Sequence, residues 1–145
     1  MTNNICTSIN QSKALIDLGL DASMADMFWD LLDGDEPEEK IPSSFPDRFD
    51  ISSEEFVPSW SLQTMMNLLP AHIFTEEHGR REVYNLHIGY NGDTPNVQYV
   101  VSTHDTVWYP EGYRPVYYTP EKAKTWIDAV CCAMEWVLKN NYYKK

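Results

Sequence analysis

The fold is decided by two runs of alternating residues, Glu82-Val83-Tyr84-Asn85-Leu86-His87-Ile88-Gly89-Tyr90 and Asn96-Val97-Gln98-Tyr99-Val100-Val101-Ser102-Thr103-His104-Asp105, which the turn Asn91-Gly92-Asp93-Thr94-Pro95 connects. We place Tyr90 opposite Val97, as a short turn at this point would impose. The cross-strand pairs on one face of the hairpin are then Ile88 with Tyr99, Leu86 with Val101 and Tyr84 with Thr103. Because this face is almost wholly apolar and the other face is largely polar, we expect an antiparallel sheet with a single covered face.

Three helices are predicted before this hairpin. Ser8-Ile9-Asn10-Gln11 has the spacing of a capping box and opens a short helix that runs through Leu18. A second short helix is expected over 23–32, where apolar residues recur at helical spacing: Met24, Met27, Phe28 and Leu31. A compact amphipathic segment over Trp60–Leu69 predicts a central helix, which the following proline ends.

The longest predicted helix closes the chain. Thr119-Pro120 combines a hydroxyl N-cap with a proline at the first helical position, so we expect a helix that continues to about Lys139. Further strands are expected over Ala71–Thr75 and, at the sheet edge, over Val116–Tyr118, and a further strand or a continuation of the hairpin's second strand over Val107–Tyr109. The predicted fold class is α+β: a three- to four-stranded antiparallel sheet covered on one face by the long C-terminal helix and the shorter central helix, with short N-terminal helices.

Length and charge set further limits. With 145 residues the chain is expected to form a single domain, 1–145, in which residues 33–50 are an acidic, proline-containing connector. The net charge is −11, and residues 21–55 hold 12 acidic residues against Lys40 and Arg48. Because no basic surface is available to release counterions, direct binding to nucleic acid or to a membrane surface is not expected. No apolar stretch approaches the ~18 residues that a membrane-spanning helix needs.

The cysteines and the first residues favour the cytoplasm. The chain has three cysteines, and Cys131 and Cys132 are adjacent within the predicted C-terminal helix, where their side chains point about 100° apart. That arrangement suits neither a disulfide nor a shared metal ion, so we expect reduced thiols that serve as small core residues. The start of the chain, Met1–Cys6, lacks the basic and apolar regions of a signal peptide. These features predict a cytoplasmic protein.

A family resemblance is carried by stretches at both ends and in the middle of the chain. They are Asn4-Ile5-Cys6-Thr7, Gln11-Ser12-Lys13, Leu15-Ile16-Asp17-Leu18-Gly19-Leu20, Ala25-Asp26-Met27, Pro58-Ser59-Trp60-Ser61-Leu62, Leu68-Leu69-Pro70 and the Asn-rich end of the last helix. In these stretches the chain resembles a group of small uncharacterised proteins encoded by gut Bacteroides-type bacteria, their prophages and mobile elements. The resemblance implies an accessory protein of the phage or mobile-element type and implies no activity, cofactor or catalytic residue.

The histidines do not form a metal site in the predicted register. His87 and His104 share a face, but they would lie about 13 Å apart along the strand at ~3.3 Å per residue. The ligands of one zinc ion each lie ~2 Å from it. His104 and Asp105 point to opposite faces of a strand, which works against a paired general base. No nucleophile elbow, phosphate-binding loop or dinucleotide-binding motif is present. We therefore expect no catalytic residue, metal or cofactor, and an enzyme of unknown class stays an alternative.

The remaining candidate site is aromatic. Five rings lie close together in the sequence around a turn and form a candidate interaction surface: Trp108, Tyr109, Tyr113, Tyr117 and Tyr118. The edge strand Val116–Tyr118 could also pair across a two-fold axis to form a homodimer. We expect a non-catalytic accessory protein that acts through contacts with an unknown protein partner. An alternative reading makes the acidic region 21–55 a nucleic-acid mimic that inhibits a host DNA-binding protein, instead of a solvated connector.

Overall fold

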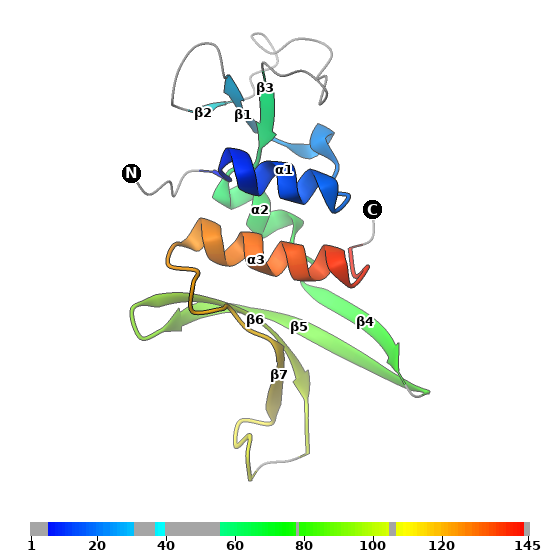
Figure 1. Cartoon of the computed structure of the whole chain (residues 1–145). Coiled ribbons are helices and arrows are strands. Elements are labelled where there is room, and N and C mark those ends of the chain that lie inside the picture. Colours follow the sequence, from blue (N-terminus) through cyan, green and yellow to red (C-terminus); the bar gives the residue numbers. More distant parts are fainter. Residues whose placement is uncertain (1–5, 31–36, 40–55, 78, 105–106, 144–145) are drawn as a thin grey trace. The chain divides into compact units, whose positions relative to one another are not determined.

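The computed structural model describes residues 6–30, 37–39, 56–77, 79–104 and 107–143 (Figure 1). The chain forms two compact units, Met1–Leu68 and Leu69–Lys145. The expectation of a single domain over 1–145 stays a prediction. Most of the predicted acidic connector, 33–36 and 40–50, lies outside the described residues.

The first unit opens with the helix α1, Ile9–Asp17. The capping box is confirmed, because the Ser8 hydroxyl accepts from the Gln11 N–H at 3.1 Å and the Gln11 side chain accepts from the Ser8 N–H at 2.9 Å. The chain leaves the helix through Leu18 and Gly19, and the φ of 107° at Gly19 is accessible to glycine at little cost. The Leu20 N–H then returns to the Leu15 carbonyl at 3.0 Å, and both leucine side chains are buried.

A three-stranded antiparallel sheet replaces the second predicted helix. A short 3-10 turn, η1 (Ala22–Met24), leads into the central strand β1 (Met27–Asp30), which pairs with β2 (Pro37–Glu39) on one side and with β3 (Phe56–Ser59) on the other. The prediction of a helix over 23–32 is therefore wrong, and the sequence pattern did not indicate this sheet.

Two side-chain contacts hold this segment in an extended form. The Trp29 Nε1–H donates to the Thr7 carbonyl at 2.9 Å. The Asp26 carboxylate accepts from both the backbone N–H and the hydroxyl of Ser61, at 2.8 and 2.5 Å. Both contacts reach residues far away in the sequence, so the extended conformation of Met27 and Phe28 was decided by tertiary structure and not by local propensity.

The central helix is confirmed as α2, Leu62–Leu68. Its first turn is closed by Ser61, whose hydroxyl accepts from the Thr64 N–H at 3.2 Å. Trp60 precedes the helix and is fully buried. Because α2 belongs to the first unit, its packing on the sheet of the second unit stays a prediction.

The second unit is built on a four-stranded antiparallel sheet in the order β4-β5-β6-β7 (Figure 1). Its strands are β4 (His72–Glu77), β5 (Arg80–Asn91), β6 (Thr94–Ser102) and β7 (Tyr113–Tyr117). The predicted register of the central hairpin is wrong by two residues, because Tyr90 lies opposite Pro95 and Ile88 lies opposite Val97. The turn is shorter than expected: Gly92, with a φ of 65°, and Asp93 alone connect the two strands, as in tight hairpin turns.

A shift of two residues leaves the faces of the hairpin unchanged. The covered face carries buried side chains from three strands: Ile73, Tyr84, Val97, Tyr99 and Val101. Leu86 on the same face is half-buried, and Ile88 is 43% exposed, so the cover does not reach the turn end of the hairpin fully. The predicted assignment of faces is confirmed for the buried part of the sheet.

The last strand carries an irregularity that the sequence did not predict. Tyr99 lies opposite Tyr117 while Val100 lies opposite Pro115, so Val116 is an extra residue in β7 and forms a β-bulge. The edge strand therefore covers Tyr113–Tyr117 and not 116–118. The strand predicted over Val107–Tyr109 is absent, because these residues form turns between β6 and β7.

The C-terminal helix covers the sheet but is shorter than predicted. α3 spans Trp126–Lys139, with Thr125 as its N-cap, and packs on β6 (Figure 1). Thr119 has a different role: its hydroxyl accepts from the Val97 N–H at 2.7 Å and donates to the Val97 carbonyl at 3.1 Å. The hydroxyl thus continues the pairing of β6 where β7 has ended, so Thr119 is not free to cap a helix.

The fold is α+β, with the C-terminal helix on one face of an antiparallel sheet. The helix packs through an apolar side whose side chains are buried: Ile127, Val130, Ala133, Met134, Val137 and Leu138. Among the described helices, none is long and apolar enough to cross a membrane.

Replacing Val97 by alanine tests the covered face against its matched residue on the other face, Val83. Val97 is fully buried, so Val97→Ala should lower the free energy of unfolding by about 2 kcal/mol or more through lost burial and a residual cavity. Val83 is 37% exposed, so Val83→Ala should cost less than about 1 kcal/mol. Urea denaturation followed by circular dichroism measures both. Equal losses would contradict the assignment of faces.

Candidate functional site

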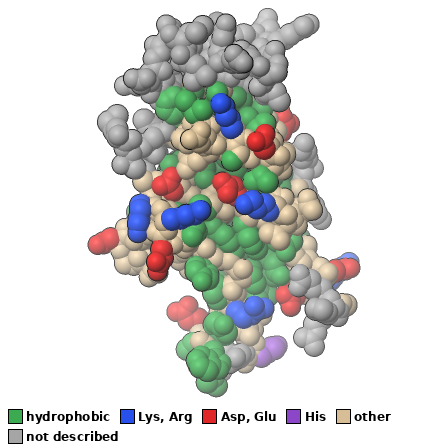
Figure 2. Space-filling model, viewed as in Figure 1, with side chains coloured by type: hydrophobic (Ala, Val, Ile, Leu, Met, Phe, Trp, Pro, Cys, Tyr) green, Lys and Arg blue, Asp and Glu red, His purple; other side chains and the backbone are tan. Residues whose placement is uncertain are grey.

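The five predicted aromatic residues do not form one surface. Trp108 and Tyr118 are 78% and 66% exposed, and Tyr113 is 45% exposed. Tyr109 and Tyr117 are only partly exposed. Figure 2 shows hydrophobic side chains at the lower end of the second unit, where the turn between β6 and β7 exposes Val107 and Trp108.

Tyr117 belongs to the core between α3 and the sheet. Its ring lies 5.0 Å from the Trp136 ring, and Trp136 stacks on Tyr99 at 5.4 Å. The bulge at Val116 explains this placement. Tyr113 and Tyr117 are four residues apart and would share a face in a regular strand, but one extra residue between them puts them on opposite faces.

The buried hydroxyls of this cluster differ in their partners. The Tyr99 hydroxyl donates to the Pro70 carbonyl at 2.8 Å, whereas the Tyr117 hydroxyl has no hydrogen-bond partner among the described residues. Burial raises the pKa of both hydroxyls above the ordinary value of tyrosine. Both rings are therefore neutral members of the core and not proton carriers.

The face of the sheet opposite α3 is a better candidate site. We call it the open face and define it by five exposed residues: Phe74, Val83, His87, Tyr113 and Pro115. Sequence reasoning placed Val83 and His87 on the polar side of the hairpin and did not predict that Phe74 and Tyr113 would join them there. Alternation along the predicted strand Ala71–Thr75 could have placed Phe74 there, because its neighbours Ile73 and Thr75 are buried on the other face.

Three cross-strand pairs join β4 to β5 on the open face. The Leu86 N–H donates to the Ala71 carbonyl at 3.0 Å, so Ala71 and Leu86 form a backbone hydrogen-bonded pair. Along an antiparallel ladder such pairs alternate with closer pairs that have no backbone hydrogen bond between them. The close pairs are therefore Phe74 with Val83, His72 with Asn85 and Glu76 with Arg81. Their side chains are in contact in two of the pairs. The His72 and Asn85 side chains form a hydrogen bond of 2.7 Å, and the Arg81 and Glu76 side chains form an ion pair of 3.0 Å.

The other end of the open face is aromatic. The rings of His87 on β5 and Tyr113 on β7 meet edge-on, with their centroids 5.7 Å apart. On β6 between them, Val100 lies opposite both Asn85 and Pro115 and is only 4% exposed. Val100 is thus covered, and the exposed side chains of the open face lie around it.

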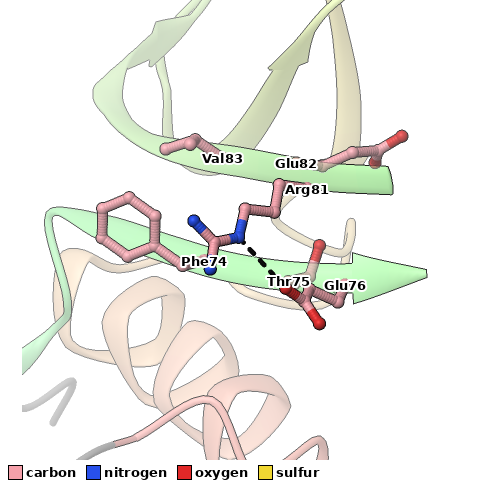
Figure 3. Close-up of a pocket in the computed structure, with 6 residues that line it drawn as sticks. All are labelled: Phe74, Thr75, Glu76, Arg81, Glu82 and Val83. Atoms are coloured by element: carbon pink, nitrogen blue, oxygen red, sulfur yellow. Dashed lines mark hydrogen bonds and ion pairs between the residues drawn. The ribbon is translucent and has the colours of Figure 1, made fainter. Parts of the chain in front are cut away.

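An open hollow lies at the β4–β5 end of this face (Figure 3). In the figure, Arg81 reaches from β5 to Glu76 on β4, with the Phe74 ring and Val83 beside it. The side chains of Arg81 and Glu76 are 88% and 71% exposed, so the ion pair contributes little stability. The hollow combines an apolar wall with one solvated ion pair, which suits contact with a protein side chain better than it suits catalysis.

The cysteines lie outside this site. Cys6 and Cys131 are buried, and Cys132 is partly buried with no disulfide. Burial, together with the nearby Glu135 carboxylate, raises the pKa of the Cys132 thiol, which keeps it protonated and poorly nucleophilic. Within the described part of the chain, no group of three or more His, Cys, Asp or Glu residues could hold a metal ion.

Two acidic residues of the region 21–55 have structural roles. Asp21 caps η1 by accepting from the Ser23 N–H, and Asp26 holds Ser61. Most of the other acidic residues of this region lie outside the described residues, so the nucleic-acid mimic is not tested by these contacts.

Comparison with known proteins adds no relative, because no family model, curated protein or solved structure matches the chain.

The two buried tyrosines make a matched pair of predictions. Tyr99→Phe removes a hydrogen bond to the Pro70 carbonyl and should lower the free energy of unfolding by about 0.5–1.5 kcal/mol. Tyr117→Phe removes a buried hydroxyl that has no partner among the described residues, so the free energy of unfolding should stay unchanged or rise. Urea denaturation of the two variants measures the difference, and the reverse order would refute this assignment.

Alkaline pH should weaken the second unit. Because burial raises the pKa of Tyr99 and Tyr117, the unfolded chain loses these protons at a lower pH than the folded chain does. The free energy of unfolding should therefore be constant with respect to these groups below about pH 10 and fall above it. Urea midpoints measured on either side of that pH should show a smaller fall in Tyr117→Phe than in the wild type. An equal fall would show that Tyr117 does not contribute.

Proposed function

We propose that this chain is a non-catalytic protein-binding module that contacts its protein partner through the open face of the four-stranded sheet. The observation that carries the proposal is the exposure of Phe74, Val83 and Tyr113 on one ordered surface. Large apolar side chains that stay exposed side by side are typical of surfaces that another protein covers.

The composition of the open face supports this function. Tyrosine and phenylalanine are enriched in the centres of protein interfaces, where a few rings contribute most of the binding free energy. The edge-on contact of His87 with Tyr113 at 5.7 Å holds both rings in place before binding, so little side-chain entropy is lost. The ion pair of Arg81 with Glu76 supplies a polar border.

The origin and location of the protein are part of the proposal. The resemblance to small proteins of gut Bacteroides-type bacteria, their prophages and mobile elements supports an accessory protein of that type. Three free cysteines, two of them buried, support a reducing compartment such as the cytoplasm.

Affinity purification from the producing cells, read by mass spectrometry, tests the surface. The double variant Phe74→Ser/Tyr113→Ser should lose the captured partner by about tenfold or more, because it removes two exposed rings from the open face. The matched control Val107→Ser/Trp108→Ser removes two exposed apolar side chains from the turn between β6 and β7 and should retain the partner.

Urea midpoints close to that of the wild type would show that both double variants fold. If the open-face variant captures its partner as well as the wild type does, the proposal is wrong. If only the control variant loses the partner, the binding surface lies at the β6–β7 turn.

A further inference from the structure

The two edges of the four-stranded sheet differ in their capacity to pair with another strand. The outermost strands are β4 and β7. On β4, the alternation set by the Leu86–Ala71 hydrogen bond turns the backbone N–H and C=O groups of His72, Phe74 and Glu76 away from β5. β4 contains no proline, so all three of these residues retain their donors.

The edge of β7 is blunted. The Thr103 N–H donates to the Gly112 carbonyl at 2.9 Å, which makes Val100–Pro115 a non-hydrogen-bonded pair and turns the Pro115 nitrogen toward the edge. Proline has no N–H to offer there, and the bulge at Val116 interrupts the strand next to it. Proline and bulges are the devices by which proteins protect an edge strand, and β4 has neither.

We propose that β4 pairs with β4 of a second copy of this chain, antiparallel and across a two-fold axis, with Phe74 opposite Phe74. The proposal goes beyond the proposed protein partner, because its backbone hydrogen bonds come from the edge of the sheet; it shares only the Phe74 ring with the open face.

The sequence of β4 is self-complementary in this register. Around the central Phe74 pair, His72 of each copy lies opposite Glu76 of the other copy, and Ile73 lies opposite Thr75. Each of the three pairs His72–Glu76, Phe74–Phe74 and Glu76–His72 can exchange two backbone hydrogen bonds, because these residues have outward-facing backbone groups. A shift by two residues in either direction places Phe74 opposite His72 or Glu76, and the ring pair is lost.

The side chains are available for these contacts. Phe74 is 70% exposed, and an aromatic pair directly opposite across two strands is favourable. The His72 Nδ1 lies 2.7 Å from the Asn85 Oδ1, so Nε2 is the ring nitrogen that remains to meet a carboxylate of the second copy. Glu76 is exposed and has a second oxygen beyond the one that contacts Arg81. The opposed imidazole and carboxylate give the second copy a chemical fit that an arbitrary strand lacks.

Sedimentation equilibrium of the full chain over a range of concentrations tests the dimer. The wild type should show a reversible rise toward twice the chain mass of 16.8 kDa. Phe74→Pro removes an outward donor from each copy without removing a bond of the β4–β5 ladder. It should raise the dissociation constant of the dimer about tenfold or more, through the loss of two hydrogen bonds.

Charge variants keep the test valid if proline disturbs the strand. His72→Glu places two carboxylates opposite each other at both ends of the paired strands and should weaken the dimer. The double variant His72→Glu/Glu76→Lys restores opposite charges in each pair and should recover it.

Cysteine variants test the register and the edge. Residues in a hydrogen-bonded antiparallel pair have Cα atoms about 5.5 Å apart, a distance that a disulfide can span. Under mild oxidation Phe74→Cys should therefore form a covalent dimer, while the control Tyr113→Cys, on the same face at the other edge, should not.

Three results would overturn the proposal. The first is a folded wild type that stays monomeric at every concentration. The second is a dimer that neither Phe74→Pro nor His72→Glu weakens. The third is a covalent dimer formed by Tyr113→Cys and not by Phe74→Cys, which would place the interface at β7, where the sequence first suggested it.

Discussion

The packing of the Trp136 ring against Tyr99 and Tyr117 is the contact on which the rest of the second unit depends. It joins α3 to the two last strands of the sheet, and local features at three places make it possible. The bulge at Val116 turns Tyr117 toward the helix. Thr119 replaces the missing strand partner of β6. At the end of α3, Asn141 takes a φ of 58°, so that Tyr142 folds back to within 5.2 Å of Trp136 and also meets the Tyr84 ring edge-on.

The parts of the fold that the sequence predicted are those with a period or a local motif. The faces of the β5–β6 hairpin were correct although the register was wrong, because a shift of two residues preserves the alternation. The capping box of α1 was correct because it needs only four neighbouring residues. The sheet of the first unit was missed because β1 is four residues long and is held by contacts of Asp26 and Trp29 with distant residues.

The candidate site was harder to predict than the fold, and the reason is one residue. Close spacing in the sequence grouped Tyr113 with Tyr117, but the extra residue in β7 separates them into a surface ring and a core ring. No composition or spacing signals a bulge at Val116. The opposite error applies to Phe74, which lies far from the aromatic run in the sequence and reaches the open face only through the pairing of β4 with β5. An interaction surface of this kind is a property of the assembled sheet and not of any one segment.

Pro115 also determines how far this sheet can be extended. A sheet that is receptive along both borders can recruit subunit after subunit and grow into a filament. On the β7 side, Pro115 offers no N–H donor at the position where a new strand would need one, and the β-bulge next to it distorts the edge strand. Growth of this sheet through strand pairing would therefore be confined to the β4 side and would end after one addition.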